Sequence, residues 1–276
     1  MSCYLCKNEK YEIVEGKVRD VPNLKILKCT NCGLVYLENF NHIQEGYYEN
    51  ASMNDFGSFN DYVESCIDND NWRIDKWKEI LKNKNVLDFG CGLGGFMKGV
   101  QDICKIDGCD LDPSWKQINP DLDIYDDLNN TPNNYYDNIM MFHVLEHLKD
   151  PINKLKEVSD KLNDKGQIFI EVPNANDALL SLYKCKAFSE FTYWGCHLYL
   201  FTNDTLRDLV NKAGLKLNFI IQVQRYPLAN HLYWLIHGKP GGHKIWKYTF
   251  KNCDKEYEES LASIGYCDTI IAGVSK

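Results

Sequence analysis

The sequence has no apolar run of the roughly 18 residues that a membrane-spanning helix needs. It also lacks the basic start and apolar stretch of a signal peptide, so we expect a cytoplasmic protein with no membrane partner. Basic residues are scarce: 31 Lys and Arg stand against 39 Asp and Glu, and the net charge is −8. Because nucleic-acid binding relies on cations that neutralise phosphates, we expect no nucleic-acid partner.

What is present suits one large α/β domain with a small module in front of it. Hydrophobic residues make up 44% of the 276 positions, enough for a substantial core. From about residue 67, strand-like and helix-like segments alternate, which predicts a Rossmann-like, seven-stranded, mostly parallel sheet with helices on both faces. The expected strands cover 85–89, 105–110, 123–125, 137–142, 167–172, 217–223 and 269–274, and the expected helices 70–82, 94–103, 151–163 and 203–213.

Two insertions interrupt this alternation, at residues 175–200 and 226–262. Both are rich in aromatic residues, and aromatic loops above a sheet often cover a ligand pocket. The alternative is that these side chains bury one another or form a dimer contact.

A glycine-rich turn follows the first expected strand, in the segment 86–95 with the sequence VLDFGCGLGG. Gly90, Gly92 and Gly95 match the G-x-G-x-x-G pattern of dinucleotide-binding enzymes, so the turn alone is ambiguous. Two acids favour another ligand. Asp88 would repel a pyrophosphate but suits the ammonium group of a methionine moiety, and Asp110 ends the next strand, where it can accept both hydroxyls of a ribose.

The segment from Asp88 to Gly94 reads D-x-G-x-G-x-G, and with it the sequence resembles class I S-adenosylmethionine (SAM)-dependent methyltransferases. The resemblance extends to segments 136–147 and 197–202 and implies SAM as cofactor, methyl transfer as activity and an antiparallel pair of final strands. Tyr48 lies in a linker, residues 41–66, that is expected to close over the cofactor. The expected cofactor contacts are Asp88, Phe89, Gly90, Cys91, Gly92, Asp110, Leu111, Asp126, Asp127, Phe142, His143 and Tyr48.

The segment His143–His147 also matches H-x-x-E-H, a spacing used by one group of zinc peptidases. That chemistry needs both histidines on one face of a helix. Here the segment directly follows an apolar strand, and Asp150 and Pro151 begin a new helix soon after it. We therefore favour a cofactor-facing strand end over a peptidase site.

Four cysteines near the N-terminus form the pattern C-x2-C-x22-C-x2-C within residues 1–40. Four thiolates at this spacing can close a tetrahedral shell around Zn²⁺ and leave no position for water. Segments 11–15 and 24–28 are expected to form the hairpin between the two pairs. The sequence thus predicts a structural zinc ribbon rather than a redox pair, since neither C-x-x-C follows a strand in a thioredoxin-like pattern. Its ligands would be Cys3, Cys6, Cys29 and Cys32.

A zinc ribbon ahead of such a domain resembles the sugar-nucleotide methyltransferases of bacterial deoxysugar and surface-polysaccharide pathways. The C-methylating members have a further large C-terminal domain, for which this chain has no room. The expected acceptor is therefore a hydroxyl or phosphate-type oxygen of a sugar, sugar nucleotide or capsule precursor. N- or C-methylation and a non-catalytic SAM-binding adaptor remain alternatives, and either a monomer or a homodimer fits.

An oxygen acceptor must lose a proton during methyl transfer, and histidine titrates in the suitable range. His197 is the favoured base, with His143 close behind it, whereas Glu146 and His147 are expected to brace the loop. Arg225 and the nearby His231 are expected to contact an anionic acceptor.

Overall fold

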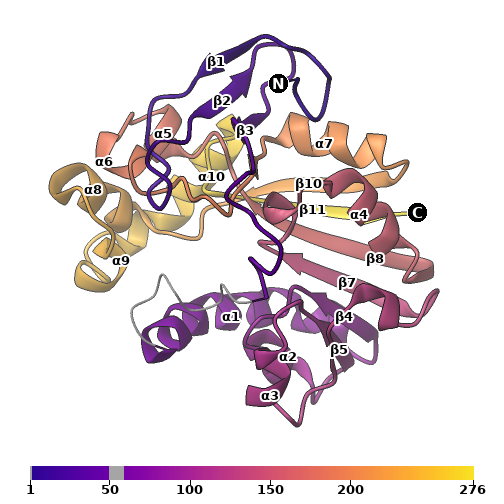
Figure 1. Ribbon diagram of the computed structural model, residues 1–276. Coiled ribbons are helices and arrows are strands. Elements are labelled where there is room, and N and C mark those ends of the chain that lie inside the picture. The colour runs from indigo at the N-terminus through magenta and orange to yellow at the C-terminus, as the bar shows by residue number, and fades with distance from the viewer. Residues whose placement is uncertain (1, 50–58) are drawn as a thin grey trace.

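The computed structural model describes residues 2–49 and 59–276 (Figure 1). Its main sheet consists, in spatial order, of β10 (Lys216–Val223), β11 (Thr269–Ser275), β8 (Leu162–Pro173), β7 (Tyr136–Phe142), β4 (Asn85–Phe89), β5 (Lys105–Cys109) and β6 (Ile124–Tyr125). All neighbouring strands are parallel except β11, which runs antiparallel to both β8 and β10. The predicted seven-stranded, mostly parallel sheet is confirmed, including the antiparallel pair at one edge.

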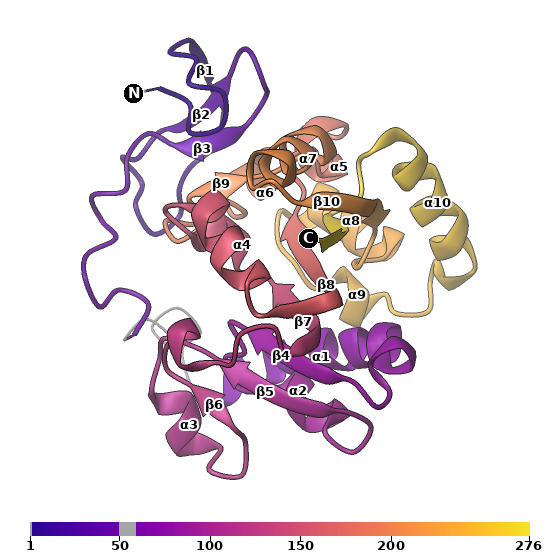
Figure 2. The same ribbon diagram turned by 90° about the vertical axis from the view of Figure 1, so that its right-hand side faces the viewer.

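Helices cover both faces of this sheet, because the central strands are apolar on both sides. In β7, Ile139 and Met141 face one buried cluster, whereas Met140 and Phe142 face another, as the two-residue period of a strand requires. Figure 2 shows α4 on one side of the sheet and α1 on the other. The helices of the main domain are α1 (Phe59–Leu81), α2 (Gly95–Val100), α3 (Ser114–Ile118), α4 (Pro151–Ser159), α7 (Asn203–Lys212) and α10 (Asp254–Ile264).

Three predicted helix boundaries are wrong, and the helix expected at 94–103 already ends at Val100. The helix expected at 70–82 begins at Phe59, so α1 is much longer than its apolar pattern indicated. The helix expected at 151–163 ends at Ser159, because Leu162 already pairs with Tyr136 as the first residue of β8. The end of α4 thus depends on a pairing partner in another strand, which the local sequence does not reveal.

The N-terminal cysteine region forms a second, antiparallel sheet of β1 (Tyr11–Ile13), β2 (Ile26–Cys29), β3 (Val35–Leu37) and β9 (Tyr199–Leu200). The predicted hairpin between the cysteine pairs is therefore confirmed. Strand β9 comes from the main domain, and Val35 and Tyr36 pair with Leu200 and Tyr199. One hydrophobic cluster runs from this sheet into the main core, so the ribbon is built into the domain surface (Figure 1). The division of the chain into a zinc ribbon (1–40), a linker (41–66) and a methyltransferase domain (67–276) remains a prediction. Residues 50–58 of the linker lie outside the described residues.

The two insertions pack against each other. The first contains α5 (Ala178–Ser181), α6 (Lys186–Ser189) and β9, and the second contains α8 (Leu228–His237), α9 (Gly242–Ile245), a 3-10 turn η3 (Lys251–Cys253) and α10. Rings of Phe188 and Phe191 lie 5.2 and 5.0 Å from that of Trp234. These aromatic residues therefore pack on one another, although Phe191 stays 37% exposed. That the insertions cover a ligand pocket remains a prediction. Within the described part of the chain, no helix is both long and apolar enough to cross a bilayer.

The core predicts a large cost for removing a buried side chain from β7. We expect Ile139→Ala to lower the free energy of unfolding by about 2–5 kcal/mol, because Ile139 is fully buried and its removal leaves a cavity. Ile264→Ala, at a position that is 54% exposed, is the control and should cost under about 0.5 kcal/mol. Urea denaturation followed by circular dichroism measures both; equal costs would contradict this packing.

Candidate functional site

The site lies where the order of the sheet changes direction. From β4 the chain continues to β5 and β6 on one side, and then crosses over to β7 on the other side of β4. Ligands of open α/β sheets bind outside the carboxyl ends of the strands at this point. The carboxyl ends of β4, β5 and β7 bring Asp88, Asp110 and His143 to the same edge. The sequence analysis predicted these strand-end positions for all three residues.

The glycine turn joins β4 to α2 and is tied to the end of β5. Gly90 has φ 82°, and a Cβ at this position would lie 2.4 Å from Val144 Cγ2, so both conformation and space require glycine. The amide of Gly92 donates to Asp110 Oδ2 at 2.9 Å, and the amide of Gly90 donates to the Cys109 carbonyl at 2.7 Å. The backbone thus approaches the ligand side of the sheet with no side chain in between.

Asp88 is a buried carboxylate with an unusual proton affinity. It is 3% exposed, and burial, with the nearby charge of Asp70, raises its pKa to about 7, although Arg73 acts in the opposite direction. A buried carboxylate without a full countercharge is stabilised when a cation binds beside it. The position therefore suits a positively charged ligand group and opposes a phosphate.

Asp110 is fixed by the backbone around it. Its Oδ2 accepts from Gly92 and its Oδ1 accepts from Asp112 at 3.0 Å, which leaves one acceptor direction on each oxygen for a pair of hydroxyls. Burial raises its pKa, although these amide donors oppose the shift.

The remaining predicted cofactor contacts lie around this centre. Leu111 is 52% exposed next to Asp110, and Phe142 ends β7 with its ring 5.0 Å from Phe96. Asp126 and Asp127 are exposed at the end of β6 and bond locally: Asn130 donates to Asp126, and Asp127 caps the turn η1 (Leu128–Asn130). Phe89 ends β4 and Cys91 lies in the turn that follows; their contact with a cofactor remains a prediction, as does that of Asp126 and Asp127.

Sequence reasoning missed a buried ion-pair network behind the turn. Glu171, fully buried near the end of β8, accepts from Arg73 Nη2 at 2.7 Å and from Nε at 3.2 Å. Burial alone would raise the pKa of Glu171, but Arg73, His143 and Arg225 lower it well below its ordinary value. Arg73 also lies 3.6 Å from Asp70 and covers the Phe142 ring. A charged residue within the otherwise apolar strand 167–172 was the one sequence signal for this network.

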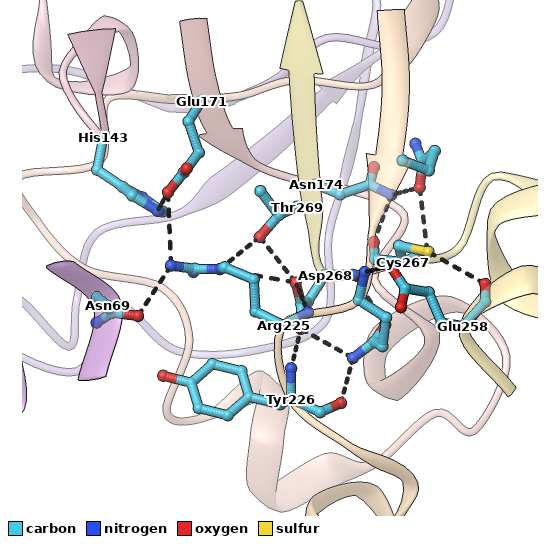
Figure 3. Close-up of polar contacts among 12 residues, drawn as sticks. Asn69, His143, Glu171, Asn174, Arg225, Tyr226, Glu258, Cys267, Asp268 and Thr269 are labelled. Atoms are coloured by element: carbon cyan, nitrogen blue, oxygen red, sulfur yellow. Dashed lines mark hydrogen bonds and ion pairs between the residues drawn. The ribbon is translucent and has the colours of Figure 1, made fainter. Parts of the chain in front are cut away.

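Arg225 reaches the same carboxylate from the turn that follows β10 (Figure 3). Its Nη1 lies 3.6 Å from Glu171 Oε1 and donates to Asn69 at 3.2 Å, while Nε donates to Thr269 at 2.8 Å. Asp268 accepts from the backbone amide of Arg225 and so fixes this turn. His231 is instead buried and bonds to Tyr257 and Gln224, which argues against the acceptor contact expected from the sequence.

His143 follows β7 with φ 55°, a left-handed conformation that is uncommon for a residue other than glycine. Its Nδ1 lies 3.1 Å from Glu146 Oε1, and its Nε2 lies 3.2 Å from Glu171 Oε1 without the alignment of a hydrogen bond. Burial alone would raise the pKa of Glu146, but the hydrogen bond and charge of His143 lower it to about 2. The ring is therefore oriented by one carboxylate and faces another.

His147 and His197 lie together on the other side of Glu146. Their ring centroids are 4.8 Å apart, and burial lowers the pKa of His197 to about 3. Tyr48, from the linker, donates to the carbonyl of His147 at 2.8 Å. Residues Leu145–His147 form only a 3-10 turn, η2, before Asp150 caps α4, so the peptidase interpretation lacks its helix.

The four N-terminal cysteines converge. Sγ of Cys3 lies 3.6 Å from that of Cys32, Sγ of Cys6 lies 3.4 Å from that of Cys29, and all four lie within 4.8 Å of one another. The Asn31 amide and the Asn8 side chain point at Cys29 Sγ from 3.4 and 3.6 Å. N–H groups directed at sulfur are typical surroundings of bound thiolates.

Comparison with known proteins identifies the domain. A family model described as a methyltransferase domain matches residues 72–218, more than half of the chain. The chain belongs to this methyltransferase family. It is an enzyme of the SAM-dependent class, as the glycine turn and the acids Asp88 and Asp110 indicated.

Solved structures share the fold of the methyltransferase at low sequence identity. A SAM-dependent methyltransferase from Archaeoglobus fulgidus is 18% identical, with a TM-score of 0.55 over 79% of this chain and 100% of that chain. A Thermotoga maritima enzyme described as a possible histamine N-methyltransferase is 17% identical, with a TM-score of 0.51 over 79% and 96%. A methyltransferase complex with the Trm112 activator from Haloferax volcanii gives 14% identity and a TM-score of 0.51 over 77% and 96%. A search of curated proteins gave no match.

The raised pKa of Asp88 predicts pH-dependent cofactor binding. Below about pH 7 a proton neutralises the carboxylate and competes with the ammonium group of SAM, so affinity should fall by up to about tenfold per pH unit. Isothermal titration calorimetry with SAM between pH 5.5 and 7.5 measures this fall. Asp88→Asn should bind weakly and lose the dependence, whereas the exposed control Asp204→Asn should keep it. A wild-type affinity that stays constant over this range would refute the role given to Asp88.

Proposed function

We propose that the methyltransferase transfers a methyl group from SAM to an oxygen of an anionic small molecule, such as a sugar nucleotide or a phosphorylated surface-polysaccharide precursor. The observation that carries this proposal is the charge arrangement at the strand ends. Arg225 and Arg73 keep 14% and 12% of their side chains exposed and share the buried Glu171 as a countercharge. Each has one further acid nearby: Asp70 lies 3.6 Å from Arg73, and Asp268 lies 3.9 Å from Arg225. An anionic acceptor could bind Arg225 there, next to a cationic cofactor beside Asp88.

The balance of charges at this edge supports a cationic cofactor. Acids outnumber the two arginines, so the site is net negative before any ligand binds. A sulfonium ion with an ammonium group offsets that excess, whereas a dinucleotide would add to it. The acids are Asp70, Asp88, Asp110, Glu146 and Glu171.

The reaction is a displacement in which the acceptor oxygen forms a bond to the methyl carbon as the bond from carbon to the sulfonium sulfur breaks. The products are the methylated acceptor and S-adenosylhomocysteine, and the hydroxyl proton goes to a base. We assign this base to His143. Glu146 orients the ring through Nδ1 and leaves Nε2 as the nitrogen that can take the proton. Nε2 lies 3.2 Å from Glu171 Oε1, the carboxylate oxygen that Arg225 also approaches. Burial makes His197 a weak base near neutral pH, so we assign it a positioning role.

We further propose that Cys3, Cys6, Cys29 and Cys32 bind a structural Zn²⁺. The support is the convergence of four thiols with amide donors around them. The ribbon sheet includes β9, so a bound ion would also hold in place the loop that precedes this strand.

Isotope-labelled SAM tests the function directly. The purified chain is incubated with labelled SAM and a cell metabolite extract, and in parallel with total RNA. We expect label in an acidic small molecule retained by an anion-exchange column. Label found only in RNA, or only in neutral metabolites, would refute the proposed substrate class.

His143→Gln should lower kcat by about 10²–10⁴-fold, because removal of a general base typically has an effect of this size. The affinity for SAM should change little. His237→Gln, at an exposed position on α8, is the matched control and should leave kcat unchanged. If the His143 variant keeps a normal kcat, His143 is not the general base.

Arg225→Met should raise the KM for the acceptor by about 10–100-fold, since a charge-assisted hydrogen bond contributes about 1.5–3 kcal/mol. The Kd for SAM should stay within about twofold of wild type. Arg207→Met, which removes an exposed arginine paired with Asp204, is the control. If the Arg225 variant keeps its KM and its thermal stability, the acceptor does not contact this residue.

A further inference from the structure

A second group of metal-binding side chains lies apart from the four N-terminal cysteines. One potential ligand atom from each of His147, Cys196 and His197 lies within 4.8 Å of the other two. His147 ends the turn η2, whereas Cys196 and His197 belong to the loop before β9. The proposed reaction assigns no chemistry to Cys196 and only positioning to His197.

The tautomer of His147 suits a ligand. Its Nδ1 lies 3.0 Å from the Cys196 carbonyl, which can only accept, so Nδ1 carries the proton. Nε2 of the neutral ring therefore has a lone pair. Histidines that bind metals typically donate their other ring N–H to a carbonyl or carboxylate in this manner.

Buried polar atoms next to this group have no partner among the described residues. Nδ1 of His197 and Oε2 of Glu146 are both inaccessible to solvent and form no hydrogen bond. Glu146 is completely buried, and such a carboxylate oxygen is costly without a countercharge. A cation beside His147 and His197 would offset the charge of Glu146 and satisfy the histidine nitrogen.

The loop that carries Cys196 and His197 is held in place by residues from distant parts of the chain. Asp20 accepts from the Gly195 amide at 2.7 Å, and His42 Nε2 lies 2.7 Å from the Gly195 carbonyl. The Trp194 ring stacks on His197 with an interplanar angle of 22°. Ligands fixed in this way lose little conformational freedom when an ion binds, which favours binding.

We propose that His147, Cys196 and His197 bind a divalent transition-metal ion of the zinc type. Two imidazoles and a thiolate are the donors that Zn²⁺ prefers, whereas Mg²⁺ and Ca²⁺ require mainly oxygen. Three protein ligands leave a fourth tetrahedral position open, as in zinc sites that bind water or substrate. An acceptor oxygen in that position is an extension that rests on the proposed function; the metal site itself does not.

Metal content of the intact chain tests this site. Protein purified after growth with zinc, and measured by inductively coupled plasma mass spectrometry, should contain about two Zn²⁺ per chain. Cys196→Ala and His147→Ala should each reduce this to about one. Cys253→Ala, which removes an exposed cysteine, is the matched control and should keep two. Wild-type protein with one ion, or variants that keep two, would overturn the proposal.

A second measurement needs no variant. Cobalt(II) added to the metal-free chain should give two distinct absorption spectra: a four-thiolate site has intense sulfur-to-cobalt bands, and a site with one thiolate and two imidazoles has weaker ones. Titration that reveals only the four-thiolate spectrum would overturn the site. SAM binding, measured on the same samples by calorimetry, tests the proposed function separately, since Asp88 and Asp110 do not belong to the group.

Discussion

Burial of carboxylates at the carboxyl ends of the central strands is the constraint on which the site depends. Asp88 and Glu171 are both removed from water, yet their environments differ. Glu171 has Arg73 and Arg225 as partners and a lowered pKa, whereas Asp88 has too little positive charge nearby and a raised pKa. One acid is thus paired within the protein, and we propose that the other pairs with the cationic cofactor. This difference distinguishes a SAM site from a dinucleotide site on a similar glycine turn.

The N-terminal ribbon and the main domain share a β-sheet and a hydrophobic cluster, unlike two independent domains joined by a linker. Strand β9 completes the ribbon sheet, and the loop before it supplies Cys196 and His197 next to the turn η2. Arg19 from the ribbon region stacks on Trp194, which in turn stacks on His197. The N-terminal region therefore packs against the loop that carries Cys196 and His197.

Sequence patterns predicted the seven strands of the main sheet, the sheet type and three of the acids and histidines at the strand ends. They did not predict the short helices α3, α5, α6, α8 and α9. They succeeded where the signal is local: a strand ending in Asp88, a glycine turn, an acid after the next strand. They failed for Arg73 and for the length of α1, because neither has a local signature. The aromatic insertions were also ambiguous, since mutual burial and ligand contact need the same residues, and only the structure shows that Phe188 and Phe191 pack on Trp234.

The sequence by itself determined the glycine turn, its flanking acids and the four-cysteine pattern, because each depends on residues that are near neighbours along the chain. Only the tertiary structure decided that Arg73 and Arg225 meet at Glu171, and that Cys196 joins His147. These partners are 98, 54 and 49 residues apart. Long-range pairs arise from how strands order themselves and helices pack, and no local spacing encodes them.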